Sequence, residues 1–181
     1  MNQTNYKCIS LLQPWASLCV HTDSNGKALK QIETRSWNTK HRGLILIHAS
    51  AKKIRLQEGM YDLIDHMQRT GFFDGYSQLP YGAIIGCVDL EAVLKTDNID
   101  SSADEYQQSM LLNADRSKFE GNIATISPQE YAFGDYSPNR YGWLLSNPIL
   151  FREPITCKGQ LSIWNLPAEL EPLVKRQIEL A

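Results

Sequence analysis

The segment that decides this fold is Lys30-Gln31-Ile32-Glu33-Thr34-Arg35-Ser36-Trp37. Side chains alternate between the two faces of a β-strand, so a strand over residues 31–37 places Glu33, Arg35 and Trp37 on one face. Ile32 points the other way and is the natural core residue. On the opposite face an acid and a guanidinium stand close enough to pair, which would hold the guanidinium in a fixed orientation.

Lys30 is out of phase with that face. It joins Glu33 only if it lies in the loop before the strand or at a bulge. The alternative for the whole segment is a solvated salt bridge beside Trp37 at the edge of the core.

Strands outnumber helices in the rest of the chain. A helix is expected after Pro14, a longer one from Ser50 to Gly71, and an amphipathic helix at 168–180. Because no steady βαβ alternation appears, the pattern favours a barrel over a doubly wound sheet. The polar stretch at 96–122 is expected to be an insertion in a single domain over 1–181. The remaining expected strands are 7–12, 44–49, 82–93, 141–145, 149–151 and 161–164.

The bulk composition is that of an ordinary globular chain. It has 181 residues, of which 43% are hydrophobic and 21% charged. No apolar run approaches the roughly 20 residues of a membrane span, and the N-terminus lacks the pattern of a signal peptide, so no membrane association and a cytoplasmic location are expected. No C-x-x-C or H-x-x-x-H spacing is present, so we expect no metal and no cofactor, and reduced structural thiols. Those thiols are Cys8, Cys19, Cys87 and Cys157.

The charge is unevenly distributed. Between Lys27 and Arg55 stand eight basic residues and one acid, a local charge of +7, whereas the whole chain carries −2 and the remainder therefore −9. Such asymmetry indicates one face that meets an anion. A basic surface that is merely solvated is the alternative.

Three further groups are candidate ligand contacts. Lys52 and Lys53, expected in the first turn of a helix, oppose the helix dipole unless that turn holds an anion; otherwise they extend into water. Trp15 and Ser17 begin another helix, whose first amides lack helical partners, although a tryptophan there also suits the core. The third group interleaves a cation with aromatic rings, which suits a nucleobase as well as packing. It comprises Arg140, Tyr141 and Trp143.

Taken together, these segments resemble the ASCH domain family of the PUA-like superfamily. The resemblance runs in order from Cys8 to Leu166. Its motifs are Gln13-Pro14-Trp15-Ala16-Ser17-Leu18, Lys30-x-x-Glu33-x-Arg35-Ser36-Trp37, Arg42-Gly43, His48-Ala49-Ser50-Ala51-Lys52-Lys53, Gly86-Cys87-Val88-Asp89-Leu90, the segment 133–145 and the closing strand 159–164.

The resemblance implies an α+β fold: a PUA-like five- to six-stranded mixed β-barrel flanked by helices. It also implies a cleft between the barrel and the first helix that binds RNA or other nucleic acid. Lys30, Glu33 and Arg35 match the cleft motif. The surrounding positions are matched by Trp15, Ser17, Lys52, Lys53 and Trp143.

Three functions stay open from the sequence. The first is binding of RNA, single-stranded nucleic acid or a nucleotide-like ligand. The second is a hydrolase, either an amidohydrolase on a modified nucleoside or a ribonuclease, with Lys30 and Glu33 as catalytic residues. Some members of the broader superfamily are such amidohydrolases and use a lysine, a threonine and a glutamate elsewhere; here Glu33 stands at the threonine position. The third is a protein-interaction domain with a protein partner.

Overall fold

A computed structural model describes residues 5–53, 79–96, 110–112 and 124–181 of the chain. The chain divides into two compact units, each of which is taken by itself. The first unit comprises Met1–Leu29, Leu44–Val88 and Asn147–Ala181, and the second comprises Lys30–Gly43 and Asp89–Ser146.

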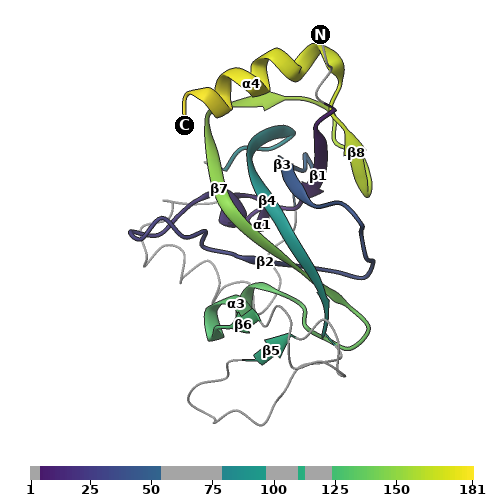
Figure 1. The fold of residues 1–181 in the computed structure, drawn as a ribbon. Helices are drawn as coiled ribbons and strands as arrows, with labels where there is room; N and C mark the ends of the chain where they lie inside the picture. The colour runs from purple at the N-terminus through teal and green to yellow at the C-terminus, as the bar shows by residue number, and fades with distance from the viewer. Residues whose placement is uncertain (1–4, 54–78, 97–109, 113–123) are drawn as a thin grey trace. The chain divides into compact units, whose positions relative to one another are not determined.

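Figure 1 labels the strands and helices of the described residues, among which β5, β6 and α3 were not predicted from the sequence. The strands are β1 (Lys7–Leu11), β2 (Ile32–Arg35), β3 (Gly43–Ala49), β4 (Ala83–Lys95), β5 (Met110–Leu112), β6 (Ala124–Ile126), β7 (Tyr141–Thr156) and β8 (Ile163–Asn165). The helices of the described residues are α1 (Trp15–Val20), α3 (Pro128–Phe133) and α4 (Glu171–Glu179), with a 3-10 turn at Ala168–Leu170.

Six strands hydrogen-bond in the order β2-β7-β4-β3-β1-β8. The division runs through two of these strands, β4 and β7, and separates Gly43 from the rest of β3. The first unit contains β1, β8 and the rest of β3 with residues 83–88 of β4 and 147–156 of β7. The second contains β2 and the small pair β5-β6 with the remaining residues of β4 and β7. β1 runs parallel to β3, whereas β8 pairs antiparallel with β1, and β2 with β7. The sheet is therefore mixed, and the predicted α+β class with five or six strands is confirmed.

One strand is longer than the sequence indicated. The expected strands at 141–145 and 149–151 are a single strand, β7, which continues through Pro148 and Pro154. Proline is tolerated where a strand lacks a neighbour on one side, because its missing N–H then costs no ladder bond. Beyond Leu144 the described residues offer β7 only β4 as a partner, since β2 pairs with residues 141–144 alone. The prediction of two strands was wrong for that reason.

Two other expectations fall largely on residues that the structure leaves undescribed. The helix expected from Ser50 to Gly71 lies mostly within residues 54–78, and the insertion expected at 96–122 lies mostly within 97–109 and 113–123. Both stay predictions.

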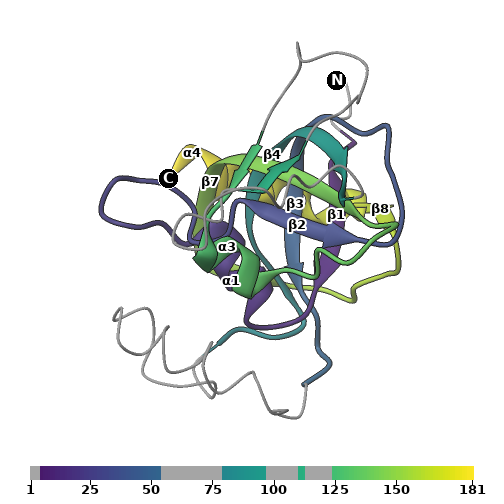
Figure 2. The ribbon, with the colours of Figure 1, turned by 90° about the horizontal axis from the view of Figure 1, so that it is seen from below.

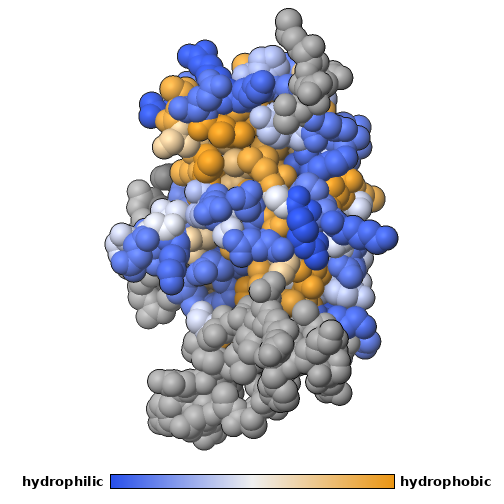
Figure 3. Space-filling model, viewed as in Figure 1, coloured by the Kyte–Doolittle hydropathy of each residue, from blue (hydrophilic) through white to orange (hydrophobic). Residues whose placement is uncertain are grey.

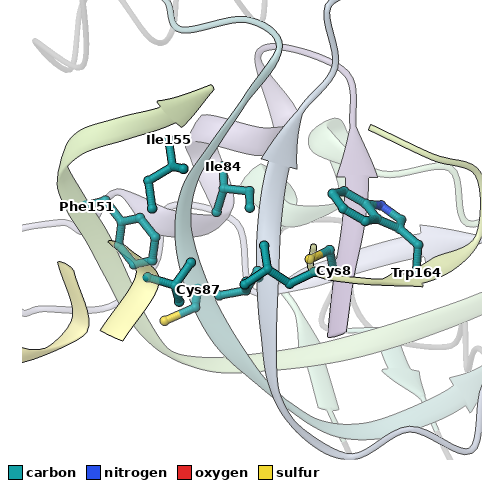
Figure 4. Close-up of a cluster of buried hydrophobic side chains, with 9 residues drawn as sticks. Cys8, Ile84, Cys87, Phe151, Ile155 and Trp164 are labelled. Atoms are coloured by element: carbon teal, nitrogen blue, oxygen red, sulfur yellow. The ribbon is translucent and has the colours of Figure 1, made fainter. Parts of the chain in front are cut away.

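The first unit is organised around a buried apolar cluster, drawn in Figure 4. Cys8 and Cys87 lie inside it and make no disulfide. Burial, and next the neighbouring Cys157, raise the pKa of the Cys8 thiol to about 12, so this thiol stays protonated and unreactive. The cluster comprises Cys8, Leu46, Ile84, Cys87, Phe151, Ile155, Trp164, Leu166 and Val174.

His48 is a core residue of the same unit. Its side chain is buried, its Nε2 lies 3.1 Å from the carbonyl oxygen of Cys157, and its ring packs edge-on against Trp164. Burial lowers the pKa of this imidazole, although the bond to the carbonyl partly opposes the shift. A Cβ at Gly159 would lie 2.4 Å from the ring, so glycine is required there. His48 is therefore a hydrogen-bonded core histidine.

The second unit has its own small core. Ile32 of β2 packs there with Leu94, Ile126 and Tyr136, and Leu144 packs against them. Ile32 thus faces the core, as the strand's alternation predicts.

Candidate functional site

β2 presents its charged face as the sequence predicts. In the antiparallel pair with β7, Glu33 stands opposite Trp143 and Arg35 opposite Tyr141. Residues directly opposite each other in such a pair project from the same face of the sheet. Arg35 Nε lies 3.3 Å from Glu33 Oε1, so the predicted ion pair is formed.

Lys30 lies just before β2 and its side chain is only 1% exposed. Its ammonium group donates to the carbonyl oxygen of Ile32. It also lies 3.3 Å from Glu130 Oε1 and 3.8 Å from Glu33 Oε2. A buried ammonium needs such partners, because an unpaired charge in the interior is very costly. Lys30 therefore does join Glu33, from the position before the strand.

Glu130 of α3 is a site residue that the sequence reasoning missed. Its Oε2 accepts a hydrogen bond from the backbone N–H of Gln31 at 2.8 Å, and its Oε1 accepts one from the N–H of Ile32 at 3.1 Å. Figure 2 shows α3 beside β2, as these bonds require. One carboxylate thus fixes both the start of β2 and the ammonium of Lys30.

Together these residues form what we call the charged cluster: Lys30, Glu33, Arg35 and Glu130. It contains two cations and two anions. Lys30 and Glu130 are buried, whereas Glu33 is 12% and Arg35 26% exposed. A ligand can therefore reach the cluster through Glu33 and Arg35.

Two tryptophans flank the charged cluster. The rings of Trp37 and Trp143 meet edge-to-face with centroids 4.7 Å apart, a favoured aromatic geometry. Trp143 is buried, and its indole N–H has no hydrogen-bond partner among the described residues. Trp37 is partly exposed. The pair therefore contains one partly exposed ring, that of Trp37, and one buried indole N–H, that of Trp143, without a hydrogen-bond partner among the described residues.

Arg140 is tied to its own loop. Its guanidinium donates to the carbonyl oxygen of Asp135, forms an ion pair of 3.3 Å with the Asp135 carboxylate, and contacts the carbonyl oxygen of Thr34. Hydrogen bonds from Ser137, and then the charge of Arg140, hold the pKa of Asp135 below its usual value. Arg140 thus braces β2, and its predicted role in ligand binding stays a prediction.

Tyr136 packs in the core of the second unit and interacts with the two carboxylates of the charged cluster. Burial, followed by the negative charges of Glu130 and Glu33, raises the pKa of this phenol far above its ordinary value. Its ring stacks on Tyr131 with centroids 5.6 Å apart. The hydroxyl therefore stays protonated beside the two carboxylates.

The other predicted contacts lie in the first unit. Ser17 is fully buried, and its hydroxyl accepts a hydrogen bond from Gln13 Nε2 at 2.9 Å. Trp15 is half-buried, and Lys52 and Lys53 are exposed, with the Lys53 ammonium 5.5 Å from the centre of the Tyr81 ring. Ligand binding by these four residues stays a prediction. The complete burial of Ser17 does not support a contact between its side chain and a ligand.

No group of three or more metal-ligating side chains is found in the described ranges. No helix there is long and apolar enough to cross a membrane.

The described residues therefore form an α+β fold with a mixed six-stranded sheet and a lysine-centred charged cluster at the start of β2. The family model of the ASCH domain matches residues 9–154, and the chain therefore belongs to the ASCH domain family.

Curated relatives support the same assignment. Over 170 residues, 93% of this chain, the sequence is 37% identical to activating signal cointegrator 1 of Mus musculus. Over 84 residues, 46% of this chain, it is 39% identical to the Homo sapiens protein of that name. The matches cover 24% and 13% of those proteins, so the chain corresponds to a minor part of each.

Among solved structures, two crystal structures of single-residue mutants of ZmASCH from Zymomonas mobilis match at 18% identity. The first covers 97% of this chain and 99% of that protein with a TM-score of 0.45. The second covers 95% and 98% with a TM-score of 0.44.

Proposed function

We propose that the chain binds single-stranded RNA, or another single-stranded nucleic acid, through the second unit. The observation that carries the proposal is the basic segment, residues 35–42. Arg35 is partly exposed, Lys40 and Arg42 are exposed, and the segment contains no acid. Glu33, the nearest acid in sequence, is already paired with Lys30 and Arg35. Exposed cations without competing carboxylates attract a phosphate backbone.

Aromatic side chains accompany these cations. Trp37 lies within the basic segment, and Tyr141 stands opposite Arg35 across the β2–β7 pair; both are partly exposed. Base–aromatic stacking contributes about 1–3 kcal/mol per base and tolerates any sequence. Membership of the ASCH domain family, which is linked to RNA binding, supports the same function.

The first prediction concerns salt and charge. Binding of a fluorescein-labelled 12-nucleotide RNA, followed by anisotropy, is expected to weaken as NaCl rises. The slope of log K against log [salt] is expected to be about −2 for three phosphate contacts. Reversing two charges in Lys40→Glu/Arg42→Glu is expected to weaken binding at least about tenfold at low salt.

The matched control is Lys158→Glu/Lys175→Glu, which makes the same charge change at exposed positions of the first unit. It should retain affinity within about twofold if the basic segment is the contact. A duplex of the same length should bind more weakly if stacking contributes. Binding that is absent at low salt, or equally weakened by both double variants, would overturn the proposal.

A hydrolase is the second candidate. The observation that favours it is the position of the Lys30 ammonium close to two carboxylates. Lys30 stands within 4 Å of both Glu33 and Glu130, and Glu33 is the more exposed of the two carboxylates. Glu33 would take a proton from a water molecule, the hydroxide would attack the acyl carbon of a modified nucleoside, and the proton would pass to the leaving amine. Arg35 would stabilise the developing oxyanion.

Turnover decides this second candidate. With acylated cytidines and RNA oligomers as substrates and mass spectrometry as the readout, the nearly isosteric Glu33→Gln is expected to lower any turnover by about 10²–10⁴-fold. The exposed Glu91→Gln in the same unit should leave turnover unchanged. Activity that survives Glu33→Gln would remove this carboxylate from the mechanism.

A further inference from the structure

A groove in the first unit has no part in the site described above. It lies between α4 and the last residues of β7 and has a volume of about 530 Å³. This volume is within the usual range for ligand sites, about 300–1,000 Å³. Its apolar lining comes from Pro154, Ile155, Leu170, Leu173 and Leu180.

Large apolar side chains are left exposed along this groove. Leu173 is 48% and Leu180 39% exposed. Leu173 lies on α4 and Leu180 directly follows it, at exposed positions where a polar side chain would cost less free energy in water. Figure 3 shows apolar residues gathered beneath α4 over the adjoining part of β7. A contiguous exposed apolar patch of this kind marks an interaction surface.

Two arginines give the groove its charge. Arg152 and Arg176 both line it, and neither guanidinium has a carboxylate partner within the described residues. Glu153 is the one acid in the lining. An occupant must therefore combine apolar side chains for the floor with carboxylates for the arginines.

The strand edge beside the groove is already closed. The backbone N–H of Glu153 donates to Gln177 Oε1 of α4 at 3.2 Å, and the next residue, Pro154, has no N–H. An extended peptide that adds to a sheet needs free main-chain donors along the edge. The occupant must dock through side chains instead, as an amphipathic helix does.

The apolar surface also continues past the end of α4. A second hollow of about 460 Å³ shares Arg152 and Leu180 with the first and adds Ile149, Leu150 and Ile178. A compact ligand would fill one hollow, whereas a helix of several turns covers both.

We propose that this α4–β7 groove docks an acidic amphipathic helix of a protein partner. Leucine-like side chains of that helix enter the groove, and its flanking glutamates or aspartates pair with Arg152 and Arg176. The proposal is independent of nucleic-acid binding, because every residue in it belongs to the first unit.

The test uses the full chain and a panel of fluorescein-labelled 16-residue peptides. Each peptide carries leucines at i, i+3 or i+4, and i+7, with glutamates beside them; matched peptides replace the glutamates by lysines or the leucines by alanines. By anisotropy, at least one acidic peptide is expected to bind about tenfold more tightly than both of its matched peptides.

Two pairs of protein variants locate the contact. Arg176→Glu is expected to weaken the acidic peptide about fivefold or more and to strengthen the lysine peptide, whereas Lys175→Glu on the same helix, outside the groove, changes neither by more than about twofold. Leu173→Ser should weaken binding, and Leu161→Ser, at a side chain 94% exposed elsewhere, should not.

Several outcomes overturn the proposal. They are no binding across the panel, equal binding of the acidic and lysine peptides, or equal effects of Arg176→Glu and Lys175→Glu. Binding of a short anionic detergent such as decanoate, without binding of any peptide, would assign the groove to a small amphiphile instead. Circular dichroism of each variant separates these results from loss of folding.

Discussion

Glu130→Ala is expected to lower the free energy of unfolding by about 3–5 kcal/mol. The substitution removes the nearest counter-charge of Lys30, whose ammonium is 3.3 Å away and almost fully buried. It also strips the acceptor from the backbone N–H groups of Gln31 and Ile32. Urea unfolding followed by tryptophan fluorescence measures the loss, because Trp37 and Trp143 lie in the same unit.

The matched control is Glu91→Ala, which deletes a carboxylate at an exposed position of the same unit. Surface substitutions of this kind usually change stability by less than about 0.5 kcal/mol. The near-isosteric Glu130→Gln keeps one oxygen acceptor but removes the charge, so it should fall between the two. Equal stabilities for the Glu130 and Glu91 variants would mean that the buried ion pair does not hold β2 in place.

The phase of β2 could be predicted from the sequence because strand geometry is strict. Alternation alone placed Ile32 in the core and Glu33 beside Arg35, and both placements are confirmed. Lys30 was ambiguous, since alternation does not extend into a loop. Its position was decided by a long-range partner that the local pattern does not contain.

Glu130 shows why that partner was not found. Ser127-Pro128-Gln129-Glu130 carries the signature of a helix start, and Ser127 does cap α3 by accepting from the N–H of Glu130. The same signature predicts that the glutamate turns back toward its own cap. In the structure its carboxylate binds Lys30 and the start of β2, a hundred residues away in sequence. The local motif marks where the helix begins but does not indicate which residues its acid binds.

The charge of the basic stretch likewise needed the structure to be interpreted. Sequence counts treat Lys30, Arg35, Lys40 and Arg42 alike, but Lys30 is buried between carboxylates and Arg35 pairs with Glu33. Only exposed cations contribute fully to attraction of a polyanion. The proposed nucleic-acid contact therefore rests most on Lys40 and Arg42, which were not among the ligand contacts predicted from the sequence.

Gly86→Ala is expected to destabilise the protein by about 3 kcal/mol, at the upper end of overpacking effects. A Cβ at Gly86 of β4 would lie 2.2 Å from the carbonyl oxygen of Ile149 and 2.9 Å from Cγ1 of Val20, at the end of α1. A backbone oxygen cannot rotate aside, so the strands or α1 must move. The midpoint of thermal unfolding is expected to fall by about 6–12 °C in a chain of this length.

Gly26→Ala separates this steric cost from the cost of backbone conformation. Gly26 has a φ of +76° with nothing within 4 Å of the new Cβ, so alanine there meets conformational strain alone. That strain amounts to about 1–2 kcal/mol for an L-residue. Thermal unfolding of both variants should therefore show the larger loss for Gly86→Ala. If Gly26→Ala were the more damaging change, close approach of Val20 and Ile149 would not be the reason for glycine at position 86, and α1 would have room to shift away from β4.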